Sequence, residues 1–165
     1  MVNLSRRSLF LGNVHRKKEL KKVTKNTVLR TVARPPTAVD EDIFKRICNQ
    51  CRQCEIECPE QVIVFKDGYP EVDVEYSACT LCGKCKTVCL TMALSGDIND
   101  IGLRVNISNV CINEYGYCDA CRDTCSALAL IWRDGKIPII DTNQCNGCGL
   151  CKESCYIEAI SLSIK

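Results

Sequence analysis

The spacing of the cysteines constrains the fold of this chain more than any other feature. All sixteen cysteines fall into four groups of four, and none is left over. Motifs one, two and four share the spacing C-x2-C-x2-C-x3-C, whereas motif three has six residues instead of two in its first gap. In chain order, the motifs are Cys48, Cys51, Cys54, Cys58; Cys79, Cys82, Cys85, Cys89; Cys111, Cys118, Cys121, Cys125; and Cys145, Cys148, Cys151, Cys155.

This spacing is typical of [4Fe–4S] cluster binding. Three cysteines two residues apart can bind three iron corners of one cube, and the fourth cysteine then binds the cube of a neighbouring motif. We expect each fourth cysteine to lie at the start of a short helix and to point away from its own loop. Disulfides do not require one spacing repeated three times. A zinc site built from two C-x2–4-C pairs leaves the third cysteine of each motif without a role.

Motif three is the weakest of the four, because its first cysteine is distant from the others in sequence. Cys111 could be a free thiol, which would leave a cluster with three ligands. However, the alternation of Leu103, Val105 and Ile107 predicts a strand that leads into the motif. The insert at residues 112–117 contains Gly116 and can loop out. We therefore expect four ligands here as well.

The two halves of the chain repeat one pattern of strands and turns. In each half an apolar run, at residues 62–65 and 128–132, is followed by an Asp-Gly pair and a second apolar run. Asp67-Gly68 and Asp134-Gly135 therefore predict two β-hairpins. The segment between motifs two and three lacks such a pair. This favours one module from motifs one and two and another from motifs three and four, while a pairing of motifs two and three stays open.

Exchange of the fourth cysteine within each module predicts four ligand sets for four [4Fe–4S] clusters. Set 1 is Cys48, Cys51, Cys54 and Cys89; set 2 is Cys79, Cys82, Cys85 and Cys58; set 3 is Cys111, Cys118, Cys121 and Cys155; set 4 is Cys145, Cys148, Cys151 and Cys125.

The predicted fold is α+β, with two tandem modules that each resemble a bacterial ferredoxin with two [4Fe–4S] clusters. Residues 1–36 form a basic N-terminal arm, residues 37–98 the first module and residues 99–165 the second. Glycines inside the motifs are expected to adopt positive φ and to let the backbone approach the cubes: Gly83, Gly147 and Gly149. Apolar side chains are expected to shield the clusters: Val62, Val64, Ile131, Ile139 and Ile160. Trp132, the single tryptophan, is expected to pack at the edge of the core.

Charge separates the predicted arm from the rest of the chain. Residues 1–36 hold ten Lys/Arg and one acid, a net charge of +9, and the remainder holds 12 basic and 19 acidic residues, a net charge of −7. The arm lacks interleaved aromatic residues and lies beside an acidic body, which argues against nucleic-acid binding. No apolar run reaches the roughly 18 residues of a membrane-spanning helix.

Arg6 and Arg7 precede a short apolar patch, as in a twin-arginine export signal. The patch stops at Gly12, basic residues follow, and no small-residue cleavage site appears downstream. We therefore predict a cytoplasmic protein in which Arg6 and Arg7 dock a partner. The chain has one histidine, His15 in the arm, and no phosphate-binding or nucleophile motif. We expect no catalytic residues and no enzymatic activity.

In its basic N-terminal segment and its four cysteine motifs, the chain resembles the NapF family, the ferredoxin-type proteins of periplasmic nitrate reductase systems. The likeness rests on SRRSLFLG, the RPP at residues 34–36, the four motifs, and above all the stretched motif three followed by ALI and CNGCGLC. Leu90, Ser126 and Tyr156 stand where bacterial ferredoxins usually have proline, which removes no ligand.

The resemblance implies a cytoplasmic accessory protein that acts in electron transfer during maturation of the catalytic subunit of periplasmic nitrate reductase, before its export. Its partners would be that subunit, or a similar molybdenum enzyme, and a redox partner protein. Two other functions stay open: a soluble polyferredoxin electron carrier, and an iron–sulfur subunit of a molybdenum oxidoreductase. The regular repeat argues against the subunit.

Overall fold

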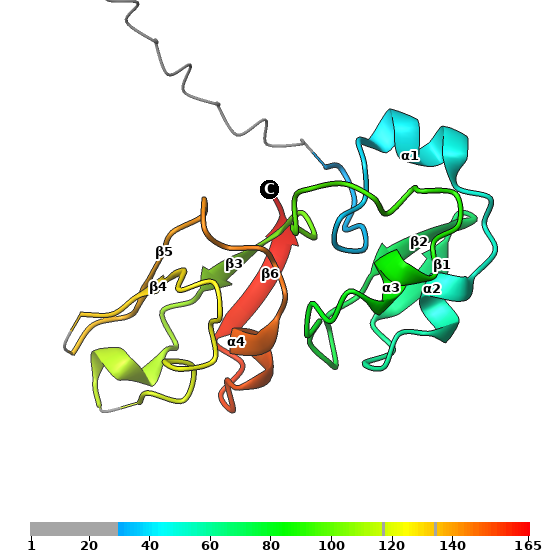
Figure 1. Cartoon of the computed structure of the whole chain (residues 1–165). Helices are drawn as coiled ribbons and strands as arrows, with labels where there is room; N and C mark the ends of the chain where they lie inside the picture. Colours follow the sequence, from blue (N-terminus) through cyan, green and yellow to red (C-terminus); the bar gives the residue numbers. More distant parts are fainter. Residues whose placement is uncertain (1–29, 117, 134) are drawn as a thin grey trace, which may run out of the picture.

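The computed structural model describes residues 30–116, 118–133 and 135–165, and these form two lobes of short helices and strands (Figure 1). The first lobe contains α1 (Glu41–Ile47), α2 (Gln53–Ile56), β1 (Ile63–Lys66), β2 (Tyr69–Val72) and α3 (Lys84–Thr87). The second contains β3 (Leu103–Ile107), the 3-10 helix η1 (Ile112–Glu114), β4 (Leu130–Ile131), β5 (Ile139–Ile140), α4 (Leu150–Glu153) and β6 (Ile160–Ile164). This mixture agrees with the α+β prediction. The predicted docking residues, Arg6 and Arg7, lie outside the described residues.

Each lobe contains a β-hairpin where the apolar runs predict one. β1 and β2 pair antiparallel from Ile63↔Val72 to Lys66↔Tyr69. The turn between them has positive φ at both central residues, Asp67 (50°) and Gly68 (81°), as a two-residue type I′ turn requires. In the second lobe β4 and β5 form a shorter hairpin with only two residue pairs. Both predicted hairpins are therefore present.

A third pair of strands closes the second lobe. β3 pairs antiparallel with β6, so that Leu103 lies opposite Ile164 and Ile107 opposite Ile160. The strand predicted from the alternating residues before motif three is thereby confirmed. Because β6 lies near the C-terminus, the second lobe begins and ends in the same sheet.

Backbone hydrogen bonds repeat between the two halves. The bond from Asp73 N–H to the Val62 carbonyl (2.8 Å) in the first half matches the bond from Asp141 N–H to the Ala129 carbonyl (2.8 Å) in the second. In the same way, the bond from Val39 N–H to the Ala93 carbonyl (3.0 Å) matches the bond from Ser108 N–H to the Ala159 carbonyl (2.8 Å). Each acceptor stands four residues after the last cysteine of its motif, and each acceptor side chain is buried. The internal repeat of the sequence is thus a repeat of structure.

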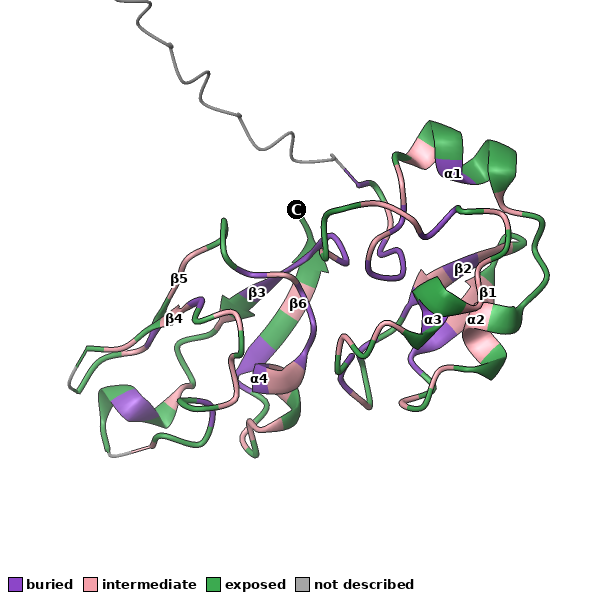
Figure 2. Cartoon of the chain, in the orientation of Figure 1, coloured by how far each residue is buried: buried purple, intermediate pink, exposed green. Residues whose placement is uncertain are grey.

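Residues 30–36, the last part of the predicted basic arm, pack against the first lobe. The Arg34 guanidinium is 3% exposed. It donates to both carboxylate oxygens of Glu41 (2.6 and 3.0 Å) and to the Pro70 carbonyl (2.9 Å). It also lies over the Phe44 ring, 5.1 Å from the centroid. Phe44 is the one buried residue of α1, whose other side chains are exposed or half-buried (Figure 2).

The two lobes are joined by backbone bonds and by glycines of motif four. Cys79 N–H donates to the Cys148 carbonyl (2.8 Å), and Ile101 N–H donates to the Asn146 carbonyl (3.0 Å). Gly147 has a φ of +74°, and a Cβ there would lie 2.5 Å from the Leu103 carbonyl oxygen. Only glycine fits such an approach. The positive φ predicted for Gly83, Gly147 and Gly149 is confirmed. Gly147 meets β3 of its own lobe, whereas a Cβ at Gly149 would lie 3.0 Å from the Val74 Cβ of the first lobe.

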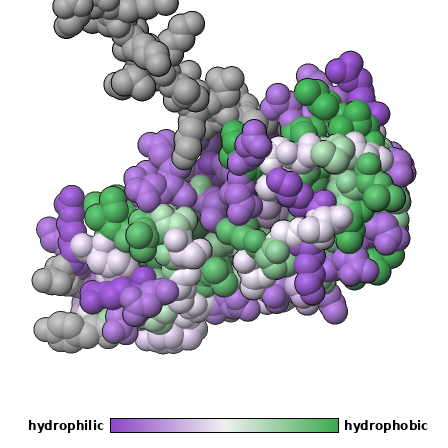
Figure 3. Space-filling model, in the orientation of Figure 1, coloured by the Kyte–Doolittle hydropathy of each residue, from purple (hydrophilic) through white to green (hydrophobic). Residues whose placement is uncertain are grey.

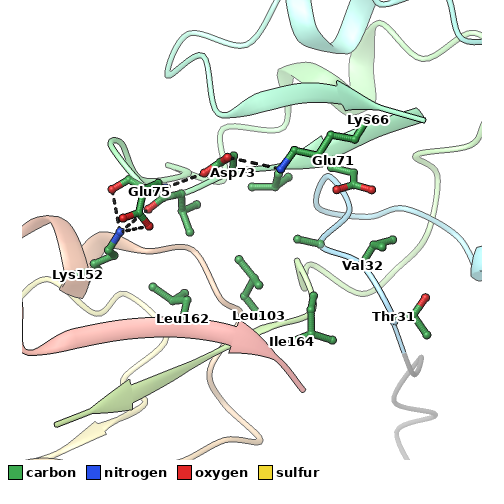
Figure 4. Close-up of a pocket in the computed structure, with 13 residues that line it drawn as sticks. Thr31, Val32, Lys66, Glu71, Asp73, Glu75, Leu103, Lys152, Leu162 and Ile164 are labelled. Carbon is green, nitrogen blue, oxygen red and sulfur yellow. Dashed lines mark hydrogen bonds and ion pairs between the residues drawn. The ribbon is translucent and has the colours of Figure 1, made fainter. Parts of the chain in front are cut away.

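A groove runs between the lobes, lined on one side by residues of β2 and the segment after it and on the other by β3 and β6 (Figure 4). Leu103, Leu162 and Ile164 form its apolar side. Across it, the Lys152 ammonium lies 2.7 Å from the Glu75 carboxylate and joins the two lobes. Within the described ranges, no helix has the length and apolar character needed to cross a membrane.

Candidate iron–sulfur cluster sites

Left-handed backbone positions shape the cysteine loops of motifs one, two and four. In each motif, the second residue after the first cysteine and the first residue after the second cysteine have positive φ. These pairs are Gln50 and Arg52 (60° and 62°), Leu81 and Gly83 (56° and 76°), and Gly147 and Gly149 (74° and 88°). Non-glycine residues rarely adopt this conformation, so its recurrence in three separate loops indicates that the motifs require it.

The short helices of these motifs lie elsewhere than expected. The third cysteines, Cys54, Cys85 and Cys151, lie within α2, α3 and α4. The fourth cysteines follow these helices by two residues. The expectation that the fourth cysteine begins a helix is therefore wrong. Each helix begins directly after a left-handed residue, Arg52, Gly83 or Gly149, so the helix can start only once the loop has turned.

The set 1 cysteines line one cavity. It brings together three cysteines of motif one and the last cysteine of motif two, Cys89. Phe44, Phe65 and Leu94 are among the apolar residues of its wall. The structure therefore places side by side the four residues that the sequence assigns to one cluster.

The set 2 cysteines line a second cavity. Here the residue contributed by the other motif is Cys58. Val62 and Ile63 are both buried and lie in the wall. The two cavities thus exchange their fourth cysteines within the first lobe.

The set 3 cysteines line a third cavity, and Cys111 is among them despite the stretched motif. The insert forms η1. The buried Asn113 side chain donates to the Lys136 carbonyl (2.5 Å) and accepts from Cys118 N–H (3.4 Å). Asn113 therefore fixes the insert to the segment between β4 and β5 and positions Cys118. Sequence reasoning missed this residue, since an asparagine inside a loop gives no sign that it will be buried.

The set 4 cysteines lie close enough together for one thiol to raise the pKa of another. Burial raises the pKa of Cys148 and Cys151, and the nearby thiols of Cys125 and Cys145 raise it further. The Cys125 sulfur also accepts a hydrogen bond from Ala129 N–H (3.3 Å), and the Cys155 sulfur of set 3 accepts the matching bond from Ala159 N–H (3.3 Å). Such N–H donors stabilise the negative charge of a metal-bound sulfur.

The prediction that apolar side chains shield the clusters is wrong for two of the five residues. Val62 and Ile160 are buried and line the cavities of sets 2 and 3, as expected. Val64 is half-buried. Ile131 and Ile139, however, are each 45% exposed and lie opposite one another on the outer face of the β4–β5 hairpin.

Burial disfavours the charged thiolate form of the cysteines as long as no positive charge lies beside them. It raises the pKa of Cys54 and Cys151 to about 12 and that of Cys79 and Cys121 to about 11, with the neighbouring thiols adding to the shift. Four thiolates around one cavity therefore need positive charge at its centre, which iron supplies when it displaces the protons.

The cysteine-lined cavities suit a cluster better than a single ion. Among the described residues, no group of three or more His, Cys, Asp or Glu side chains is arranged to hold one metal ion. A tetrahedral zinc site, with Zn–S bonds of about 2.3 Å, would bring its sulfurs to about 3.8 Å from one another. The cysteines of sets 1 to 3 line cavities instead, which is the arrangement that a cube of iron and sulfide atoms requires.

The four sets form a row in the order 1, 2, 4, 3. Cysteines of sets 1 and 2 share one core cluster, those of sets 3 and 4 share another, and Cys79 of set 2 is hydrogen-bonded to Cys148 of set 4. The charge of Cys85 in set 2 contributes to the raised pKa of Cys54 in set 1. The Cys79 pKa is raised in part by Cys148 of set 4, to which Cys79 is hydrogen-bonded. The Cys151 pKa is raised in part by Cys121 of set 3. The row therefore passes through the junction of the lobes, and sets 1 and 3 lie at its ends.

The cysteine-lined cavities and the repeated hairpins define an iron–sulfur protein of the ferredoxin class. Residues 47–93 match the family described as 4Fe-4S dicluster domain, and residues 138–161 match the 4Fe-4S binding domain. The chain is 35% identical to an "uncharacterized protein" of Haemophilus influenzae, over 84% of this chain and 82% of the relative. It is 30% identical to the ferredoxin-type protein NapF of Escherichia coli (78% and 82%) and 29% identical to the ferredoxin-type protein NapG (79% and 69%).

The chain belongs to the family of ferredoxin-type [4Fe–4S] proteins. It is an iron–sulfur electron-transfer protein related to NapF and NapG. The predicted cluster type and protein class are thereby confirmed.

Proposed function

We propose that the chain holds four [4Fe–4S] clusters, one in each of sets 1 to 4, and acts as an electron-transfer accessory protein for a molybdenum enzyme. The observation that carries this proposal is the occurrence of three cavities, each lined by four cysteines that come from two motifs. A bound [4Fe–4S] cluster accepts and releases one electron at a time. The residues of this chain supply the thiolates, bury six of the sixteen cysteines, and keep the four sets in one row.

The proposed partner is the catalytic subunit of a periplasmic nitrate reductase, or of a similar enzyme, bound in the cytoplasm before export. The relation to NapF supports this assignment. The charge of the chain supports docking through the arm, because residues 1–36 carry +9 and include Arg6 and Arg7. On the face shown in Figure 3, hydrophilic and hydrophobic side chains are interspersed over both lobes. The positive charge of the arm therefore explains partner selection better than the mixed hydropathy of this face does.

Capture of the partner from cells tests this function. The tagged chain is purified without oxygen from cells that express a periplasmic nitrate reductase, and the bound proteins are identified. We expect the catalytic subunit with its export signal still attached. Replacement of both Arg6 and Arg7 by alanine should abolish this capture, whereas Lys17→Ala with Lys18→Ala, which removes equal charge from the same arm, should reduce it only modestly.

If the wild-type chain captures no molybdenum enzyme but reduces and oxidises soluble redox proteins, it is a polyferredoxin carrier and the accessory role is wrong. If capture is as strong with both arginines replaced, docking through Arg6 and Arg7 is wrong even though the partner is right.

A further inference from the structure

The set 3 cavity differs from the others in carrying hydrogen-bond donors on aromatic side chains. Trp132 and Tyr156 both line it, together with the four cysteines. The Tyr156 hydroxyl donates to the Cys118 sulfur at 3.8 Å. The rest of the wall is apolar and includes Ile107, Pro138 and Ile160.

The Trp132 indole nitrogen is buried and has no hydrogen-bond partner among the described residues. An indole N–H can only donate, and leaving a buried donor unpaired costs about 1–3 kcal/mol. The ring follows directly after β4, and the Arg122 guanidinium lies over it, 4.8 Å from the centroid. The side chain is thus held in place, and its unpaired donor indicates that an acceptor occupies the cavity.

The first lobe provides an internal comparison. Phe65 and Trp132 each stand seven residues after the last cysteine of the preceding motif, and Leu90 and Tyr156 each follow directly after the next fourth cysteine. Phe65 and Leu90 line the set 1 cavity, as Trp132 and Tyr156 line that of set 3. Arg52 even lies over Phe65 at 4.9 Å, as Arg122 lies over Trp132. The two end cavities therefore have matching walls, but only set 3 has donors at these positions.

We propose that Trp132 N–H donates a hydrogen bond to a sulfide of the cluster held by set 3, and that Trp132 and Tyr156 together raise the reduction potential of this cluster above that of set 1. The inference rests on the proposed binding of four clusters. One electron added to a cluster increases the negative charge on its sulfurs, so donors stabilise the reduced form more than the oxidised form, and no proton is transferred. Because sets 1 and 3 lie at opposite ends of the row, electrons collect at the set 3 end, and we assign that end to the electron-accepting partner.

Anaerobic redox titration of the full chain, followed by EPR, tests this proposal. Trp132→Phe and Tyr156→Phe remove one donor each and keep the ring. At a fixed ambient potential, each should lower the ratio of reduced to oxidised set 3 cluster by about two- to tenfold, and a tenfold change corresponds to 59 mV for one electron. The control is Tyr115→Phe, which changes a phenol of the same lobe that is 84% exposed and should leave every potential unchanged.

Detection of the donor nitrogen provides a second measurement that needs no folded Trp132 variant. In the wild-type chain grown with tryptophan labelled with ¹⁵N at the indole nitrogen, the reduced cluster should show a ¹⁵N hyperfine coupling, which belongs to Trp132 because the chain has one tryptophan. If that coupling is absent, or if both phenylalanine variants keep all potentials, the proposed role of Trp132 is wrong. A wild-type chain that holds fewer than four clusters would instead contradict the proposed function. The two failures can be told apart, because the cluster content is measured on the wild-type chain alone and the role of Trp132 on the variants and the labelled chain.

Discussion

Replacement of Gly147 by alanine should weaken the junction between the lobes, and Gly83 supplies a matched control. The two glycines have nearly equal φ, +74° and +76°, so an added methyl group costs each about 1 kcal/mol in backbone strain. A Cβ at Gly83 meets nothing within 4 Å. At Gly147 it would lie 2.5 Å from the Leu103 carbonyl oxygen and 2.9 Å from the Leu103 Cβ.

The backbone at Gly147 therefore has to move, and the neighbouring bond from Cys79 N–H to the Cys148 carbonyl moves with it. Loss of that bond costs about 1 kcal/mol, and the strain of overpacking adds about 1–3 kcal/mol. We expect Gly147→Ala to destabilise the protein by about 2–4 kcal/mol more than Gly83→Ala does.

Urea-induced bleaching of the clusters, recorded without oxygen, measures this difference. Gly147→Ala should lose its visible absorbance at a clearly lower urea concentration than Gly83→Ala, and limited proteolysis should cut first between the lobes. Equal bleaching midpoints for the two variants would refute the argument that Gly147 is required by the contact with Leu103.

Three further predictions concern the cysteines and their supports. Cys111→Ser should remove one cluster, seen as about four fewer irons per chain and the loss of one EPR signal; an unchanged spectrum would show that Cys111 is a free thiol. Asn113→Ala should lower iron occupancy in the same site, because the insert loses its bond to the Lys136 carbonyl, whereas Asn109→Ala at an exposed position should not; equal iron contents would contradict this role. The iron-free chain should be most stable below pH 9 and lose stability as pH rises toward 12. The reason is that burial raises the pKa of Cys54 and Cys151 from 9.0 to about 12, so the folded thiols resist an ionisation that the unfolded chain permits. Circular dichroism against pH checks this, and a flat profile between pH 9 and 12 would contradict it.

The sequence predicted those features that depend on local spacing. The Asp67-Gly68 turn needs two residues that tolerate positive φ and strands on either side, all of which are visible in the sequence. The grouping of each fourth cysteine with its partner motif followed from the repeat, because the Asp-Gly pairs mark where each module folds back on itself.

Features that depend on which face of an element packs against the rest of the protein could not be predicted from the sequence. β4 and β5 contribute two apolar cross-strand pairs, Leu130 with Ile140 and Ile131 with Ile139. Adjacent pairs point to opposite faces of a hairpin, so one pair had to be exposed. Composition cannot say which. The position of Arg34 is a similar case, since only the folded chain brings Glu41, Phe44 and the Pro70 carbonyl around its guanidinium.

The iron content of the chain tests the central claim most directly. Protein purified without oxygen should contain about sixteen irons and about sixteen acid-labile sulfides per chain, as four [4Fe–4S] clusters require. A content of about eight or twelve irons that does not rise on reconstitution would contradict the claim that all four cysteine sets hold clusters.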